Sequence, residues 1–218
     1  MLDRRNIKIR FRRLLLLVRA LRTVALIPFI ILNIVIPLLL LFIFLRKGAG
    51  DELQFTANRL YGLFLPFMLC WCSIFVQKFY FEEPGCELLF VTSTKGKTTD
   101  MVLLFLLEIG LELLLLMPLF IFVQGFRQYC FGLFPVSLFY FGFSYLLSFA
   151  FRSITPTLLV SVVYTLLNLI SPLQTVHFPF YYSPESQTEF LRCELPLALT
   201  GIAAVAVTSL MMLKRRKV

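Results

Sequence analysis

Long runs of apolar residues recur along this 218-residue chain. Each is roughly 18 residues or longer, which is enough for an α-helix to cross a hydrocarbon core of about 30 Å. A membrane β-barrel would instead show short segments in which polar and apolar residues alternate. The pattern therefore predicts an all-α integral membrane protein with one six-helix transmembrane domain over residues 24–213. Its spans lie near residues 24–45, 60–80, 101–124, 130–150, 155–172 and 195–213.

Composition excludes a soluble protein, because 59% of the residues are hydrophobic and only 15% are charged. The net charge of +9 is compatible with nucleic acid or with a membrane surface, and the placement of the charges favours the membrane. With six spans, both tails lie on one side. That side carries most of the basic residues, including those of the N-terminal segment, Lys78, Lys95, Lys97, Arg152 and the tail 214–218. The opposite side carries Arg46, Lys47, Arg59, Arg127 and Arg192.

Under the positive-inside rule, this distribution predicts cytoplasmic N and C termini in a multi-pass plasma-membrane protein. The basic composition, rich in Phe and Leu, is compatible with a bacterial plasma membrane. We expect no nucleic-acid partner. The first apolar run is too long for a signal peptide and no small-residue cleavage site follows it, so we expect it to remain as the first span.

Residues 1–23 are predicted to form an amphipathic elbow helix. One face gathers the basic residues Arg4, Arg5, Lys8, Arg12, Arg19 and Arg22, and the opposite face gathers leucines and other apolar residues. Such a helix lies in the inner headgroup layer, with its arginines on lipid phosphates. A simple topogenic charge cluster is an equally good interpretation.

Two further features of the predicted outer side stay open. Cys130 and Cys193 are the cysteines that meet oxidising conditions, yet the sequence does not place them within bonding range, so we expect free thiols. The segment 173–194 combines aromatic residues with Pro179 and Pro184, which suits a partly inserted, re-entrant gate. A plain surface loop fits it equally well.

The segment between spans two and three, on the predicted cytoplasmic side, reads FEEPGCELLFVTSTKGKTTD from Phe81 to Asp100. Its Pro-Gly pair breaks the chain after span two, and the residues that follow can begin a short helix along the inner face. The residues that define this segment are Glu82, Glu83, Gly85, Glu87, Leu88 and Leu89.

This segment resembles the coupling helix of the type-2 ABC transporter permeases, a family of exporter subunits. Those proteins have an amphipathic elbow, six spans with both ends inside, and an acidic-Gly-Glu-Leu-Leu segment that contacts the ATPase. The usual proline after the leucine pair is absent here, where Thr92, Ser93 and Thr94 stand. The resemblance implies an exporter. It also implies a second permease subunit, as a homodimer, and cytosolic ATPase subunits that bind ATP and Mg²⁺. The aromatic, apolar character of span four, with Phe139, Tyr140, Phe143 and Tyr145, favours an amphipathic substrate such as a peptide, lipid-like molecule or drug.

We expect no catalytic site, cofactor or metal in this chain itself. Gly96, Lys97 and Thr98 reproduce the end of a phosphate-binding loop, but Val91 stands where its first glycine belongs. An intramembrane protease is also disfavoured, because His177 is the only histidine and lies on the predicted outer side.

Two acids, Glu108 and Glu112, lie four residues apart and therefore share one face of the predicted third span. An ionisable residue inside the bilayer is costly unless it faces a partner, water or a cavity. One interpretation places both in a translocation pathway or a subunit interface. Another places Glu108 at the headgroups or uses both acids to cap polar groups of adjacent spans. A third makes them the proton sites of a proton-coupled secondary carrier, the main alternative to the ABC permease.

Overall fold

The computed structural model describes residues 15–16, 18–19, 21–48, 51–82, 94–122, 126–170 and 195–215. These residues are almost entirely helical, and no β-strand occurs among them. The helices are η1 (Arg22–Leu26, 3₁₀), α2 (Ile27–Ile30), η2 (Ile31–Val35, π), α3 (Ile36–Lys47), α4 (Asp51–Met68), α5 (Trp71–Phe81), α7 (Thr94–Phe122), α8 (Phe126–Phe151), α9 (Thr155–Ile170) and α11 (Leu195–Arg215). The prediction of an all-α membrane protein is confirmed.

Five stretches of the described chain are long and apolar enough to cross a membrane: Thr23–Arg46, Glu52–Phe81, Thr98–Leu119, Gly132–Phe151 and Leu195–Met212. They correspond to five of the six expected spans. The fifth expected span is α9, which has 16 residues and extends about 24 Å. It is shorter than the others, and the expected remainder up to residue 172 lies outside the described residues.

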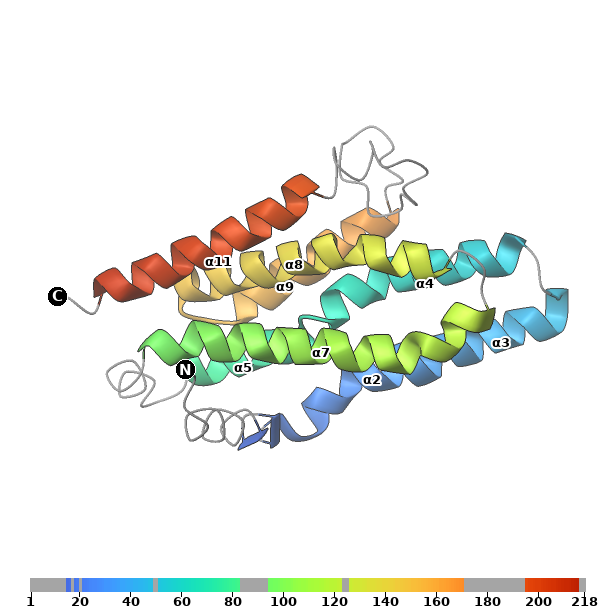
Figure 1. Ribbon diagram of the computed structural model, residues 1–218, viewed down its shortest axis with the longest axis horizontal. Coiled ribbons are helices and arrows are strands. Elements are labelled where there is room, and N and C mark those ends of the chain that lie inside the picture. The colour runs from blue at the N-terminus through green and yellow to red at the C-terminus, as the bar shows by residue number, and fades with distance from the viewer. Residues whose placement is uncertain are drawn as a thin grey trace, which may run out of the picture.

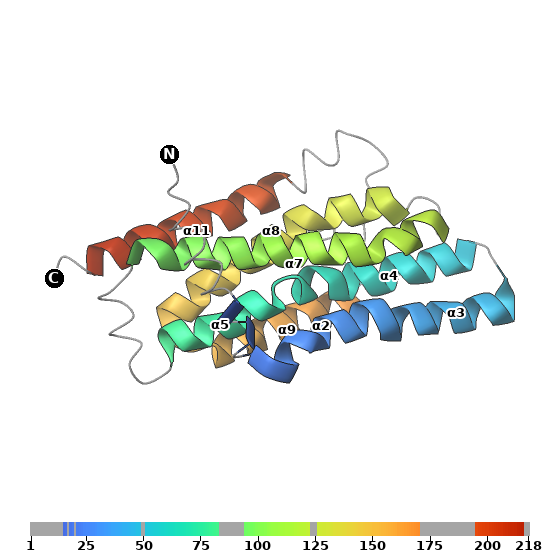
Figure 2. The ribbon, with the colours of Figure 1, turned by 60° about the horizontal axis from the view of Figure 1, so that its bottom comes forward.

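The helices run up and down along the long axis of the bundle, as Figure 1 shows from one side and Figure 2 from another. η1, α2, η2 and α3 form one continuous crossing, and α4 and α5 together form the second. The C-terminal end of α11 lies at the same end of the bundle as η1, the end of α5 and the start of α7. The described part of the chain therefore makes six antiparallel passes. We call the end that holds Glu82 and the end of α11 the α5 end.

Helix α8 is the centre of the bundle, because it contacts α11, α4, α9, α5 and α7. Its closest approach is to α11, where Gly142 faces Gly201. A Cβ atom added at either glycine would overlap the backbone of the other helix. Small residues at such crossings let helix backbones approach closely in a membrane, where packing replaces the hydrophobic effect as the source of association. The two glycines therefore fix how α8 and α11 cross.

Two of the six passes are not regular α-helices. The first contains the π-helix η2, and the hydroxyl of Tyr61 donates a 2.9 Å hydrogen bond to the carbonyl of Leu32 within it. The second breaks between α4 and α5 at Leu69 and Cys70, shortly after Pro66. π-Helical turns and broken helices both leave backbone groups without their usual partners, so other side chains have to supply them.

Candidate functional site

The break in the second span exposes the first backbone N–H groups of α5 in the middle of the bundle. The first N–H groups of any helix lack an intrahelical acceptor. Cys70, which precedes α5, provides no side-chain cap. In the chain after the break, regular bonding resumes with the 2.8 Å bond from Ile74 N to Cys70 O. The donors before Ile74 therefore need an acceptor from another helix.

Glu108 of α7 is that acceptor. The amide of Cys72 donates to Oε1 at 2.9 Å, and the hydroxyl of Ser73 donates to Oε2 at 2.8 Å. The side chain is 3% exposed, so these bonds are shielded from solvent and lipid. A carboxylate at a helix N-terminus also interacts favourably with the helix dipole. Glu108 thus caps α5 from a neighbouring helix, the geometry that the capping interpretation of this residue describes.

Glu112 lies one turn further along α7 and has a different environment. Its Oε2 accepts a 2.9 Å hydrogen bond from the side-chain amide of Asn33. Its Oε1 is buried and has no hydrogen-bond partner among the described residues. A buried carboxylate oxygen without a partner is expensive in a protein interior, so it calls for a chemical explanation. Glu112 is therefore only half satisfied, whereas Glu108 is bonded through both oxygens.

Other polar contacts join the break to the rest of the bundle. The thiol of Cys70 donates to the carbonyl of Ser137 in α8 at 3.2 Å. The indole of Trp71 donates to the carbonyl of Val24 in η1 at 3.0 Å. Cys70 and Cys72 are free thiols. The α4–α5 break is thus held by the first pass, by α7 and by α8 at once.

A second capping carboxylate, Glu82, lies at the end of α5. Its Oε1 accepts hydrogen bonds from the amide of Ile154 at 2.6 Å and from the hydroxyl of Ser153 at 2.5 Å. Both donors belong to the turn that leads into α9, directly after Arg152, whose φ of 52° reverses the chain. Glu82 therefore ties the end of the second pass to the turn between the fourth and fifth.

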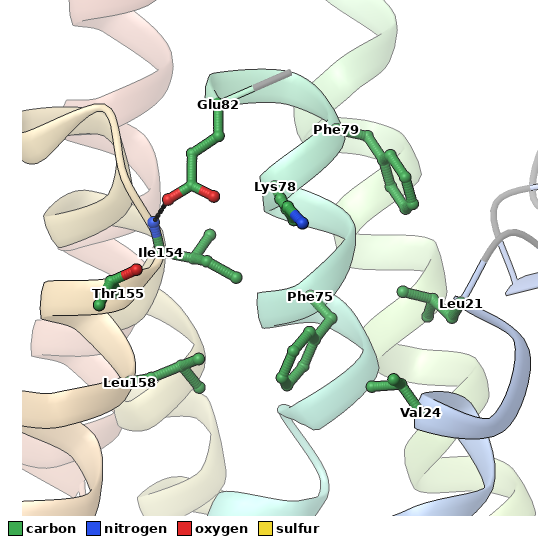
Figure 3. A pocket seen from close by; sticks show the side chains of 9 residues that line it. All are labelled: Leu21, Val24, Phe75, Lys78, Phe79, Glu82, Ile154, Thr155 and Leu158. Carbon is green, nitrogen blue, oxygen red and sulfur yellow. Dashed lines mark hydrogen bonds between the residues drawn. The ribbon is translucent and has the colours of Figure 1, made fainter.

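Next to Glu82, a cavity of about 460 Å³ opens between η1, α5 and α9. Figure 3 shows its walls, with Lys78 on α5, Glu82 directly after that helix, and apolar side chains around them. The lining residues are Leu21, Val24, Phe75, Lys78, Phe79, Glu82, Ile154, Thr155 and Leu158. The site thus combines one positive and one negative side chain with an apolar wall.

The structure describes only part of the predicted site residues. Glu82 contacts the α9 turn, whereas Glu83, Gly85, Glu87, Leu88 and Leu89 lie outside the described residues. Of the expected membrane anchors, Arg19 is exposed and Arg22 begins η1, whereas Arg4, Arg5, Lys8 and Arg12 also lie outside. Cys193 and the segment 173–194 likewise lie outside the described residues. The coupling segment, most of the elbow and the gate therefore stay predictions.

The resemblance of Gly96, Lys97 and Thr98 to a phosphate-binding loop has no counterpart in the fold, because all three lie within the helix α7. The hydroxyl of Thr98 is hydrogen-bonded to that of Tyr145 at 3.0 Å and accepts from Ser209 at 3.2 Å. It joins α7, α8 and α11 rather than facing a ligand. No cluster of three or more metal-binding side chains occurs in the described part of the chain.

The partners of the two acids were not predicted from the sequence. Asn33 was detectable, because it is the one polar side chain in the apolar run from Val24 to Leu45. Ser73 and the amide of Cys72 were not, because their role follows from the break in the second span. Gln77, one turn after Ser73, is also fully buried, and neither of its side-chain polar atoms has a partner among the described residues.

Comparison of the sequence with protein-family models and curated proteins, and of the fold with solved structures, found no match.

Proposed function

We propose that this chain is the transmembrane permease subunit of an ATP-driven ABC exporter, which moves an amphipathic substrate out of the cytoplasm. A separate cytosolic subunit hydrolyses ATP with Mg²⁺, and a second permease subunit, a further copy of this chain, completes the pathway. The observation that carries the proposal is the interruption of the second span between α4 and α5. Interrupted helices inside the membrane are a recurrent feature of secondary transporters, so the break supports transport as such. The resemblance of the segment that follows α5 to a coupling helix favours the ABC class.

The break makes α5 a separate rigid element. It begins at Trp71 in the middle of the bundle and ends at Phe81, where the chain enters the coupling-like segment from Glu82 to Leu89. A force applied to that segment by an ATPase would therefore act on α5 without having to bend α4. In this mechanism Leu69 and Cys70 are the hinge, and the ATPase selects between two positions of α5.

Glu82 extends this motion to a second part of the bundle. Because its carboxylate holds the turn before α9, a displacement of α5 reaches α8 and α9 as well. Glu108 links the other end of α5 to α7. The two carboxylates thus connect α5 to three other helices, α7, α8 and α9.

Large aromatic side chains in the described part of the interior favour a pathway between two subunits. Tyr61, Phe141 and Tyr145 are fully buried, and Phe105 stacks on Phe141 with ring centroids 4.5 Å apart. In contrast, α3, α7 and α11 present exposed apolar faces, with Leu45, Leu114 and Leu210 among the most exposed side chains. A second copy and lipid together would cover such faces.

Glu112 supports a second candidate, a proton-coupled secondary carrier. Its buried Oε1 lacks a hydrogen-bond partner among the described residues, and a transported proton at that oxygen would remove the cost of a buried charge. In that mechanism Glu112 carries the proton. Glu108 has a structural role, since it is already bonded through both oxygens. Such a carrier needs no ATPase.

The decisive experiment is purification of the tagged protein in mild detergent from its native host, followed by mass spectrometry of what accompanies it. We expect a stoichiometric ABC ATPase, and we expect Glu87→Arg to release it while the protein still inserts in the membrane. Absence of any ATPase, under conditions that preserve a known ABC complex, would favour the carrier. In that case Glu112→Gln should abolish transport driven by a proton gradient.

A further inference from the structure

The cavity beside Glu82 has the features of a site for an amphiphile. Its volume of about 460 Å³ lies within the range of roughly 300–1,000 Å³ that is usual for small-molecule sites. Its walls come from three separate parts of the chain, namely η1 with the preceding Leu21, α5 and α9. Leu21, Val24, Phe75 and Leu158 make the part away from Glu82 apolar. A wholly polar ligand would leave that part unfilled.

The rim of the cavity carries two opposite charges one helical turn apart, on α5 and directly after it. Lys78 is exposed, and its ammonium group makes no hydrogen bond or ion pair with any described residue. Glu82 is half-buried and uses Oε1 to bond Ser153 and Ile154. The site therefore offers a free ammonium group and a fixed carboxylate above an apolar wall (Figure 3).

The position of the cavity suits a membrane lipid. It lies at the α5 end of the bundle, which the distribution of basic residues predicts to be cytoplasmic. Lysine side chains near the ends of membrane helices extend toward the headgroup layer. The rim is thus at headgroup level, and the apolar part faces the acyl chains.

We propose that this cavity binds a zwitterionic phospholipid with a primary ammonium group, of the phosphatidylethanolamine class. The phosphate lies against Lys78, the ammonium group donates to Glu82, and the upper part of one acyl chain contacts Phe75 and Leu158. A phosphatidylglycerol headgroup has no cation for Glu82. A phosphatidylcholine headgroup has a cation but no N–H to donate to the carboxylate.

The test is a competition for retained lipid. The full-length protein is purified, delipidated and reconstituted in nanodiscs that contain equal amounts of phosphatidylethanolamine, phosphatidylcholine and phosphatidylglycerol. It is then released into detergent, and the lipids that remain bound are counted by native mass spectrometry. One charge-assisted hydrogen bond more than the competitors predicts at least about a tenfold preference for phosphatidylethanolamine.

Three variants locate the binding. Lys78→Gln removes the phosphate contact. Glu82→Gln keeps an oxygen for the amide of Ile154 but removes the charge. Leu158→Trp fills the apolar part. Glu82→Gln should reduce the retained phosphatidylethanolamine to the level of the other two lipids, because it removes the one contact that they lack. Lys78→Gln and Leu158→Trp should lower the retention of all three lipids, because each of them has a phosphate and acyl chains. Arg59→Gln, an exposed charge on α4 outside the cavity, is the matched control and should leave the preference intact.

Equal retention of the three lipids by the unmodified protein would overturn the proposal. So would a total retention of lipid that Lys78→Gln and Arg59→Gln reduce to the same extent, because the lipid would then be bound by general surface charge. The measurement needs no ATPase and no substrate. Its result therefore tests lipid binding independently of the proposed transport function.

Discussion

Glu108 and Glu82 both cap a helix from a different helix, but one does so inside the bundle and the other at its end. Glu108 is 3% exposed and bonds two donors of the α5 N-terminus through separate oxygens. Glu82 is half-buried, bonds its two donors before α9 through one oxygen, and lies beside an open cavity. Where water cannot replace a lost hydrogen bond, the same local geometry contributes more to stability.

The largest expected effect is that of Glu108→Ala. It leaves the amide of Cys72 and the hydroxyl of Ser73 buried without an acceptor, which should cost about 3 kcal/mol of unfolding free energy. Thermal unfolding in detergent, followed by intrinsic fluorescence, measures the loss. Glu108→Gln retains an acceptor oxygen and should lose much less. Equal stability of the Ala variant and the unmodified protein would show that the cap is not formed.

A double-mutant cycle should show that Glu108 and Ser73 are coupled. Ser73→Ala, Glu108→Ala and the double variant should give a coupling free energy of about 1–2 kcal/mol, because the two side chains share a buried, charge-assisted bond. The same unfolding measurement serves for all members of the cycle. Ser144→Ala, which removes a buried serine that bonds within α8, is the control partner and should add independently.

Glu82→Ala should have a smaller effect, of about 1 kcal/mol, as expected for the loss of a partly solvated helix cap. Water can reach the freed donors of Ser153 and Ile154 through the neighbouring cavity. We expect the loss to appear locally, as faster amide hydrogen exchange in the first turn of α9 with little change in α5. Faster exchange in both helices to the same degree would mean that the two caps belong to one cooperative unit.

Glu112→Gln should change stability least, by less than about 0.5 kcal/mol, because glutamine keeps an oxygen for Asn33 and removes a charge that is only half satisfied. If Glu112 belongs to a pathway, transport or substrate preference should nevertheless change. A variant that is unstable and otherwise normal in transport would assign Glu112 to packing instead.

The fold of this molecule could be predicted from the sequence, whereas its two caps could not. The apolar runs were enough for the all-α membrane fold, because the bilayer imposes helices of a known length. Glu108 and Glu112 stood out because acids are costly in such runs. The cap itself could not be predicted, since it depends on the break at Leu69 and Cys70 and on which helices become neighbours.

Glu82 was singled out for a different reason, its place in a segment that resembles a coupling helix. Its contact with Ser153 and Ile154 joins positions about 70 residues apart in the chain, a pairing that no local pattern reveals. Asn33 gave a visible signal as a polar residue in an apolar run. Its partner, Glu112, could only be identified once the first pass and α7 lay side by side.

The contact between Gly142 and Gly201 has a consequence for biosynthesis. Helix α8 organises the bundle, yet its closest partner, α11, is the last described helix to leave the ribosome. Until then Gly142 of α8 faces lipid or a membrane chaperone, and the bundle stays incomplete. A substitution as small as Gly201→Ala would therefore be recognised late, by the cell's quality-control machinery, after the earlier spans have already been inserted.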